Sequence, residues 1–301
     1  MNGVACEKPA PLRRNDTVPP APPPPLVAGQ VTRAADSPWD SSAGPVFLTI
    51  GPSASVGSVV FPAIAADTEV RVSALDVSPY KRVTFDLIGN GRVVGTAAFS
   101  SLVPPDIPED CSAWPLMQLS GLGADATSRV WTIAFEVGRV LPISFDSIAG
   151  MTSSDSSRLA IDLARAASGV PGDTVAELRG LPYQVRRAYR FDIAPGVEGV
   201  LAEVQRVLNQ EANPMEEHLL LVAERDSASR GRLAVAYYER TAGSEEILES
   251  SEILALIRFT AGGDLVAFVA RYVGDGVIYS MLQRTGSRRW RLQWSSPYTG
   301  C

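Results

Sequence analysis

From Val46 onward, apolar and polar residues alternate in short runs that are bounded by glycine, proline and aspartate. Alternation with a period of two is typical of strands with one buried face, so the pattern predicts a mainly β fold. In the first half of the chain the expected strands are residues 46–50, 58–61, 69–73, 83–88, 92–99 and 130–135, with a loop over residues 101–129. This rhythm predicts a β-sandwich-like domain of immunoglobulin-like character over residues 46–150.

The clearest expected hairpin joins residues 83–88 to residues 92–99. Asn90 and Gly91 lie between the two runs, and this dipeptide supplies the two positive φ angles of a type I′ turn.

One short helix is expected after Met151, with Ser153 or Ser154 as its N-cap. Gly169 and Pro171 end the helical pattern. Three apolar positions repeat on one face, which we expect to pack against a sheet: Leu159, Leu163 and Ala167.

Residues 151–301 are expected to form an antiparallel β meander domain that contains this helix. Its expected strands are residues 183–193, 199–208, 217–225, 233–240, 252–260, 265–273, 277–283 and 289–294. In the last strand, period two puts Trp290, Leu292 and Trp294 on one face. The simplest interpretation of this face is an edge of the core, and the alternative is a platform on which sugar rings stack.

The terminal meander turns at Gly274-Asp275-Gly276 and ends with tryptophan. Over about the last 35 residues it resembles the hairpin-rich blades of FG-GAP and related propeller repeats. The alternating aspartates that hold calcium in those repeats are missing here, and the sequence has no second copy of the unit, so the calcium site does not carry over. The tail 290–301 is also similar to that of uncharacterised secreted bacterial proteins, a resemblance that implies no function.

Residues 1–45 are rich in proline, alanine, aspartate and serine and are predicted to form a disordered tether. The stretch Gly3-Val4-Ala5-Cys6 resembles the lipobox of bacterial lipoproteins, in which the cysteine carries lipid. Gly3 departs from that pattern, and the charged and apolar regions of a signal peptide are absent. The resemblance implies a lipid on Cys6, and therefore a membrane partner and a place in the bacterial envelope.

The chain has three cysteines, and two remain once Cys6 is set aside. A disulfide between Cys111 and Cys301 is predicted, because a cysteine at the end of a chain is useful in an oxidising compartment. Closing so long a loop contributes roughly 5 kcal/mol at most in the chain-entropy model. The alternative is a cytoplasmic protein with three free thiols.

Composition excludes several functions. The net charge is −6 and the sequence pI is about 5.0, so no nucleic-acid partner is expected. No apolar run approaches the roughly 20 residues of a membrane-spanning helix, so the folded body is expected to be soluble. Gly121-Leu122-Gly123 lacks the strand and helix that flank a dinucleotide fingerprint.

His218 is the only histidine and follows Glu216 and Glu217. It could act as a general base, but no nucleophile or ligand partner is identifiable beside it, so we interpret it as structural. Period two predicts that it points the same way as Leu220 and Val222. The acidic stretch 244–252 is interpreted as a solvated edge.

No catalytic residue, cofactor or metal ligand is assigned from the sequence. We therefore expect an extracytoplasmic, lipid-anchored protein with a non-catalytic binding or structural role, whose partner is an unidentified envelope protein or polymer. The alternative is a carboxylate-based hydrolase of envelope polymers, which requires a cleft with two facing carboxylates.

Overall fold

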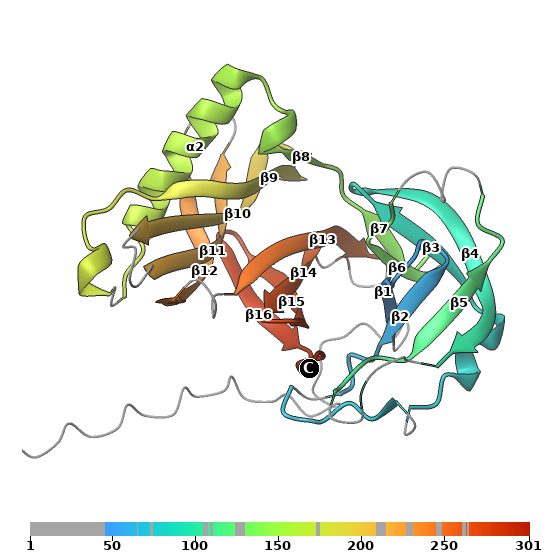
Figure 1. The fold of residues 1–301 in the computed structure, drawn as a ribbon. Helices are drawn as coiled ribbons and strands as arrows, with labels where there is room; N and C mark the ends of the chain where they lie inside the picture. Colours follow the sequence, from blue (N-terminus) through green and yellow to red (C-terminus); the bar gives the residue numbers. More distant parts are fainter. Residues whose placement is uncertain are drawn as a thin grey trace, which may run out of the picture.

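Figure 1 shows the computed structural model of the chain, which describes residues 46–64, 66–72, 75–104, 108, 111–123, 130–172, 175–208, 215–226, 231–244, 249–260, 263 and 265–301. The fold is mainly β, as predicted. The described strands form one six-stranded antiparallel barrel and two five-stranded antiparallel sheets, and one α-helix is described.

The N-terminal strands form a closed barrel in the order β1-β2-β5-β4-β3-β6. These strands are β1 (Phe47–Ile50), β2 (Val56–Val60), β3 (Thr84–Gly89), β4 (Arg92–Val103), β5 (Leu116–Ser120) and β6 (Ile133–Glu136). The prediction of a sandwich is wrong at this level, because β1 pairs with both β2 and β6 and so closes the sheet. Closure leaves no unpaired edge.

Two local expectations in the barrel also differ from the structure. Strand β5 lies within residues 101–129, where a loop was expected, and it pairs with β2 and β4. The described residues 69–72 are not a strand. The hairpin of β3 and β4 is confirmed, and both Asn90 and Gly91 have positive φ, at 50° and 71°.

The second half of the chain forms two sheets, named here the outer sheet and the middle sheet. The outer sheet has the order β12-β11-β10-β9-β8 and the middle sheet has the order β16-β15-β14-β13-β7. The outer strands are β8 (Phe145–Ser147), β9 (Gln184–Ala194), β10 (Val197–Leu208), β11 (Met215–Asp226) and β12 (Ala234–Ser244). The middle strands are β7 (Val140–Pro142), β13 (Ser250–Phe259), β14 (Leu265–Val273), β15 (Gly276–Gly286) and β16 (Arg289–Ser295).

The elements stack in four layers: helix α2 (Ser153–Ser168), the outer sheet, the middle sheet and the barrel (Figure 1). The middle sheet is therefore covered on both faces. Its strand β14 is apolar and buried at every position from Leu265 to Ala270 because it has no solvent-facing side there. Strands β7 and β8 come before residue 150 in the chain, yet they belong to the middle and outer sheets.

Helix α2 packs its predicted stripe, Leu159, Leu163 and Ala167, on the outer sheet. The N-cap is Thr152, one residue before the expected Ser153, since the Thr152 side chain accepts a hydrogen bond from the Asp155 backbone N–H. The helix ends at the predicted Gly169.

The predicted terminal meander of β14, β15 and β16 is confirmed, while its resemblance to FG-GAP repeats stays a prediction. The expectation that Trp290 and Trp294 share a face is wrong. Trp290 packs toward the outer sheet and Trp294 toward the barrel. A bulge opposite Met281 and Leu282 adds one residue to β16, which reverses the side on which the following residues lie.

Cys111 and Cys301 form the predicted disulfide, with Cα atoms 4.5 Å apart. The last residues run back along the protein, where Ser112 and Gly300 exchange backbone hydrogen bonds. Tyr298 lies against Gly276, whose lack of a side chain leaves room for the aromatic ring.

Candidate functional site

A cavity of about 340 Å³ lies between the outer and middle sheets. Its lining residues, which define the inter-sheet cavity, are Glu203, His218, Leu220, Glu239, Arg240, Thr241, Glu249, Ser251 and Arg271. They come from β10, β11 and β12 on one side and from β13, β14 and the residue before β13 on the other. The cavity therefore brings charged side chains from the two sheets together.

Strand alternation places His218 in this gap. Leu220 and Val222 face the middle sheet, whereas Leu219 and Leu221 face helix α2. His218 shares the side of Leu220, as period two predicts, and it is 5% exposed. The face that carries His218, Leu220 and Val222 is therefore part of the core.

The imidazole of His218 is held between carboxylates. Its Nε2 is 2.7 Å from Oε2 of Glu216, and its Nδ1 is 3.3 Å from Oε1 of Glu203. Nδ1 is also 3.0 Å from the backbone carbonyl oxygen of Glu249. Burial alone would lower the pKa of His218, but the hydrogen bonds to Glu203 and Glu216 outweigh burial and raise the pKa.

Arg271 brings positive charge to the other side of the cavity. It forms an ion pair with Glu239, and its Nε lies 3.4 Å from Oε1 of Glu249. The hydroxyl of Tyr237 also donates to Glu239. Burial raises the pKa of Glu249, although Arg271 opposes this change.

Glu203 has an unusual environment. The side chain is 2% exposed, and Arg186 and His218 both contact its Oε1, each at 3.3 Å. Its Oε2 has no hydrogen-bond partner within the described part of the chain. The cavity therefore contains buried carboxylates of two kinds: Glu249, whose pKa is raised, and Glu203, which has an unpaired oxygen.

A separate buried ion pair lies on the opposite face of the outer sheet. Arg206 donates two hydrogen bonds of 2.9 Å to Glu217, and the hydroxyl of Tyr183 donates to the same carboxylate. The guanidinium of Arg206 also stacks on the ring of Tyr183, 4.8 Å from its centroid. These groups pair with one another and form a structural cluster on the face of the sheet that helix α2 covers.

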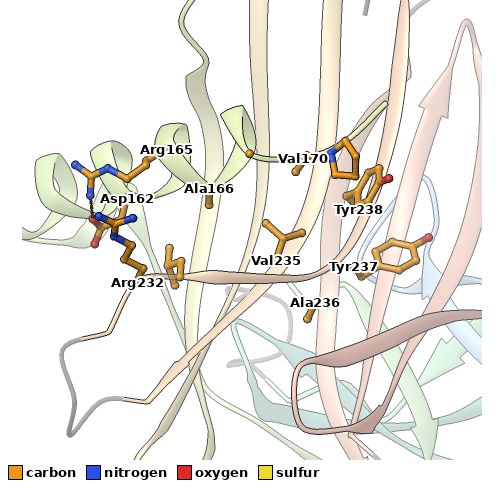
Figure 2. Close-up of a pocket in the computed structure, with 12 residues that line it drawn as sticks. Asp162, Arg165, Ala166, Val170, Arg232, Val235, Ala236, Tyr237 and Tyr238 are labelled. Atoms are coloured by element: carbon orange, nitrogen blue, oxygen red, sulfur yellow. Dashed lines mark ion pairs between the residues drawn. The ribbon is translucent and has the colours of Figure 1, made fainter. Parts of the chain in front are cut away.

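A second hollow is an open groove of about 580 Å³ between helix α2 and strand β12. Figure 2 shows Asp162, Arg165 and Arg232 at one end of this groove and Tyr237 and Tyr238 at the other. The carboxylate of Asp162 is paired with Arg165 and with Arg225. The groove is larger than the inter-sheet cavity, but its one carboxylate is already paired, whereas three carboxylates line the cavity, so the groove offers less chemistry.

The residues singled out from the sequence do not come together in one site. Cys6 lies outside the described residues, and Cys111 and Cys301 form a disulfide at the C-terminal tail. Gly121 has a φ of 73°, residues 121–123 belong to no helix or strand, and residues 124–129 lie outside the described residues. Within the acidic stretch, residues 245–248 lie outside the description, whereas Glu249 lines the cavity rather than a solvated edge.

Sequence reasoning missed Glu203, Glu239 and Arg271. Glu203 interrupts the apolar run 200–204, and a charge at such a position is a signal that could have been used. Arg271 follows a six-residue apolar run in β14 and gives a weaker signal of the same kind. Their meeting with His218 depends on how two sheets stack, which the sequence pattern does not specify.

Among the described residues, no group of three or more His, Cys, Asp or Glu side chains is arranged to hold a metal ion. No helix in the described ranges is both long and apolar enough to cross a membrane. Comparison with protein-family models, with curated proteins and with solved structures found no match to this chain.

Proposed function

We propose that this chain is an extracytoplasmic, lipid-anchored binding protein of the bacterial envelope, and that the inter-sheet cavity is its ligand site. The disulfide supports a location outside the reducing cytoplasm, because such bonds persist in oxidising compartments. The lipobox-like context of Cys6 supports an anchor. The observation that carries the binding role is the cavity itself, a space of about 340 Å³ whose wall brings together the charged side chains of Glu203, His218 and Arg271.

The arrangement favours binding over catalysis. Arg271 is engaged by Glu239 and Glu249, and His218 is engaged by Glu203 and Glu216. Groups held in mutual ion pairs keep fixed positions and charges, which suits recognition of a ligand. Within the described part of the chain, Oε2 of Glu203 and Nε and Nη2 of Arg271 are buried without a hydrogen-bond partner.

Membrane fractionation tests the anchor. Wild-type protein expressed from its own gene should sediment with membranes, and Cys6→Ser should be released into the soluble fraction. Cys301→Ser is the matched control and should stay with membranes. A wild-type protein that is soluble and carries three free thiols would contradict the proposed location.

Native mass spectrometry tests the binding role. Protein purified from its own cells should carry a small molecule, and Ser251→Leu should lose it because the larger side chain fills part of the cavity. Ser101→Leu makes the same change at an exposed site on β4 and should keep the ligand. Equal occupancy in both variants would rule out the cavity as the site.

A carboxylate-based hydrolase is the second candidate, since the cavity does hold Glu203 and Glu249, and burial raises the pKa of Glu249 as a general acid requires. Hydrolysis of envelope polymers by the wild type would favour this candidate if Glu203→Gln and Glu249→Gln each abolished it. The binding proposal expects no such hydrolysis.

A further inference from the structure

The groove between helix α2 and strand β12 lies at an open edge of the outer sheet. Strand β11 pairs with one side of β12, and no described strand pairs with the other side. An unpaired edge presents backbone N–H and C=O groups with which a further strand can pair. The groove shares no lining residue with the inter-sheet cavity, so its role is independent of the function proposed for that cavity.

The groove follows the edge of β12 and not one face of the sheet. Four consecutive residues of the strand line it, Val235–Tyr238. Ala236 and Tyr237 pack toward the middle sheet, whereas Val235 pairs with Ala223, which faces helix α2. Figure 2 shows Val235 and Ala236 pointing to opposite sides of the strand. Because residues of both faces line one groove, the groove includes the backbone edge between them.

The end of the groove beside the start of β12 carries positive charge (Figure 2). Arg165 and Arg232 line this end, and both are exposed. The carboxylate in the lining belongs to Asp162, which lies 3.5 Å from Arg165. None of the ion pairs between described residues includes Arg232. Two accessible guanidinium groups therefore remain for a carboxylate that enters the groove.

The neighbouring charged groups do not reverse this balance. Arg225 holds Asp162 at 3.0 Å and Glu198 at 2.8 Å, so those two carboxylates are paired. Asp226, at the end of β11, does not line the groove. Glu239 pairs with Arg271 in the inter-sheet cavity.

The direction of β12 indicates which group brings the carboxylate. The strand begins at Ala234, so the cationic end of the groove lies at its N-terminal side. Every strand pairing in the outer sheet is antiparallel. A segment that pairs antiparallel with β12 runs toward Arg232, and its own C-terminus then lies at the two arginines.

The rest of the groove suits the side chains of an extended peptide. Ala166, Val170 and Val235 supply apolar surface, and Tyr238 is 39% exposed at the far end. The volume of about 580 Å³ falls within the roughly 300–1,000 Å³ of ligand pockets. At about 3.3 Å per residue, residues 232–238 extend over roughly 20 Å, enough for about five residues of an added strand.

From these observations we infer that the groove between helix α2 and strand β12 binds the C-terminal segment of a partner protein, which pairs antiparallel with β12 and places its terminal carboxylate at Arg165 and Arg232.

Fluorescence anisotropy of the full chain with labelled pentapeptides tests the inference. The probes have free C-termini, apolar residues of every type at the last and third-last positions, and threonine elsewhere, because alternate residues of a strand share a face. We expect a subset to bind, at least about tenfold more tightly than the same peptides with C-terminal amides. Failure of every probe, or equal binding of the amides, would overturn the inference.

Arg232→Gln removes one of the two cations at an exposed position and should weaken peptide binding at least about tenfold. Arg289→Gln is the matched control, since Arg289 is exposed on β16, the edge strand of the middle sheet, and does not line the groove. Equal affinities in the two variants would contradict the role of Arg232.

Ala166→Leu places a larger side chain in the groove and should weaken binding at least about tenfold. Ala164→Leu makes the same change on helix α2 at a residue that also packs against the outer sheet but does not line the groove. This control should bind as the wild type does, and so should Ser251→Leu in the inter-sheet cavity. Loss of binding in Ser251→Leu alone would place the peptide in the cavity and overturn the inference.

Hydrogen exchange of the wild type tests strand addition without any substitution. Amide exchange in β12 should slow on saturation with the tightest peptide, because its edge N–H groups gain partners. Exchange in the edge strand β16 should not change. Binding without protection of β12 would contradict pairing with this strand.

A second copy of the chain is the other occupant that an open edge accepts. Sedimentation velocity should show one species whose mass does not depend on protein concentration. A dimer that Arg232→Gln or Ala166→Leu dissociates would assign the groove to self-association and overturn the inference.

Discussion

Buried charged side chains in this protein are grouped by the sheet face on which they lie. On β11, Glu217 points toward helix α2 and pairs with Arg206, whereas its neighbour His218 points into the inter-sheet cavity. The direction of His218 could be predicted from period two alone. Its partner Glu203 could not, because it comes from another strand through a pairing that only the sheet establishes.

Glu224 has the most complete environment of these buried acids. Arg284 donates to both of its carboxylate oxygens, and Trp290 and the Arg288 backbone N–H donate as well. Glu224→Gln should lower the free energy of unfolding by about 3 kcal/mol, because Glu224 is buried and the change removes the counter-charge of the half-buried Arg284 guanidinium. Urea unfolding at pH 7 measures this change.

The control for Glu224→Gln is Glu69→Gln, which removes the carboxylate from an ion pair with Arg71 that is exposed on both sides. Exposed pairs of this kind contribute little, so no measurable change is expected. Equal losses in the two variants would show that the Glu224 cluster does not stabilise the fold.

The raised pKa of His218 has a consequence for stability. Glu203, Glu216 and Arg186 are the charged groups that face it, and the carboxylates favour the protonated imidazole. The contribution of protonated His218 to the free energy of unfolding should be complete below its pKa in the unfolded chain, near 6.5. This contribution should disappear as the pH rises through the higher pKa of His218 in the folded protein. The stability difference between the wild type and His218→Gln should therefore shrink on going from pH 6 upward. A difference that grows with pH would contradict the assignment.

At the scale of elements, the pattern of apolar residues indicates whether one or both faces of an element are buried. Strand β14 is buried on both faces and its sequence reads as a continuous apolar run. Helix α2 has one buried face, so its 3.6-residue periodicity predicted both the helix and the side that packs. The bulge in β16 could not be predicted, because a single extra residue in a strand leaves no recognisable pattern in the sequence.

Two neighbouring residues of helix α2 provide a matched test of this packing. Leu163 is fully buried against the outer sheet, and Ile161 is 59% exposed. Leu163→Ala should cost about 3 kcal/mol through lost contacts and the cavity that remains, whereas Ile161→Ala should cost well under 1 kcal/mol. Thermal or urea unfolding distinguishes them, and similar losses would place the helix differently from Figure 1.

At the scale of the whole molecule, the mainly β class, the helix, most strands and the disulfide could be predicted from the sequence. Barrel closure could not, because it depends on the pairing of β1 with β6 between residues about 85 positions apart. The inter-sheet cavity likewise forms only where the outer and middle sheets stack. The candidate site therefore could not be predicted from the individual strands. Its signals in the sequence are the interruption of an apolar run by Glu203 and, more weakly, Arg271 at the end of the apolar run of β14.

The disulfide between Cys111 and Cys301 covalently links two distant parts of the described chain. It closes a sequence separation of 190 residues and ties the C-terminal tail to the segment before β5. Cys111→Ser should lose about 3 to 5 kcal/mol of unfolding free energy, by release of constraint on the unfolded chain. Guanidinium unfolding with and without reductant measures this, and a wild type that is insensitive to reductant would contradict the prediction.

The central claim is that the inter-sheet cavity is a ligand site, and a high-resolution crystal structure of the protein purified from its own cells tests it most directly. The account predicts electron density for a small molecule inside the inter-sheet cavity and in contact with Leu220. A cavity that holds only ordered water, or that is closed by its own side chains, would contradict the claim.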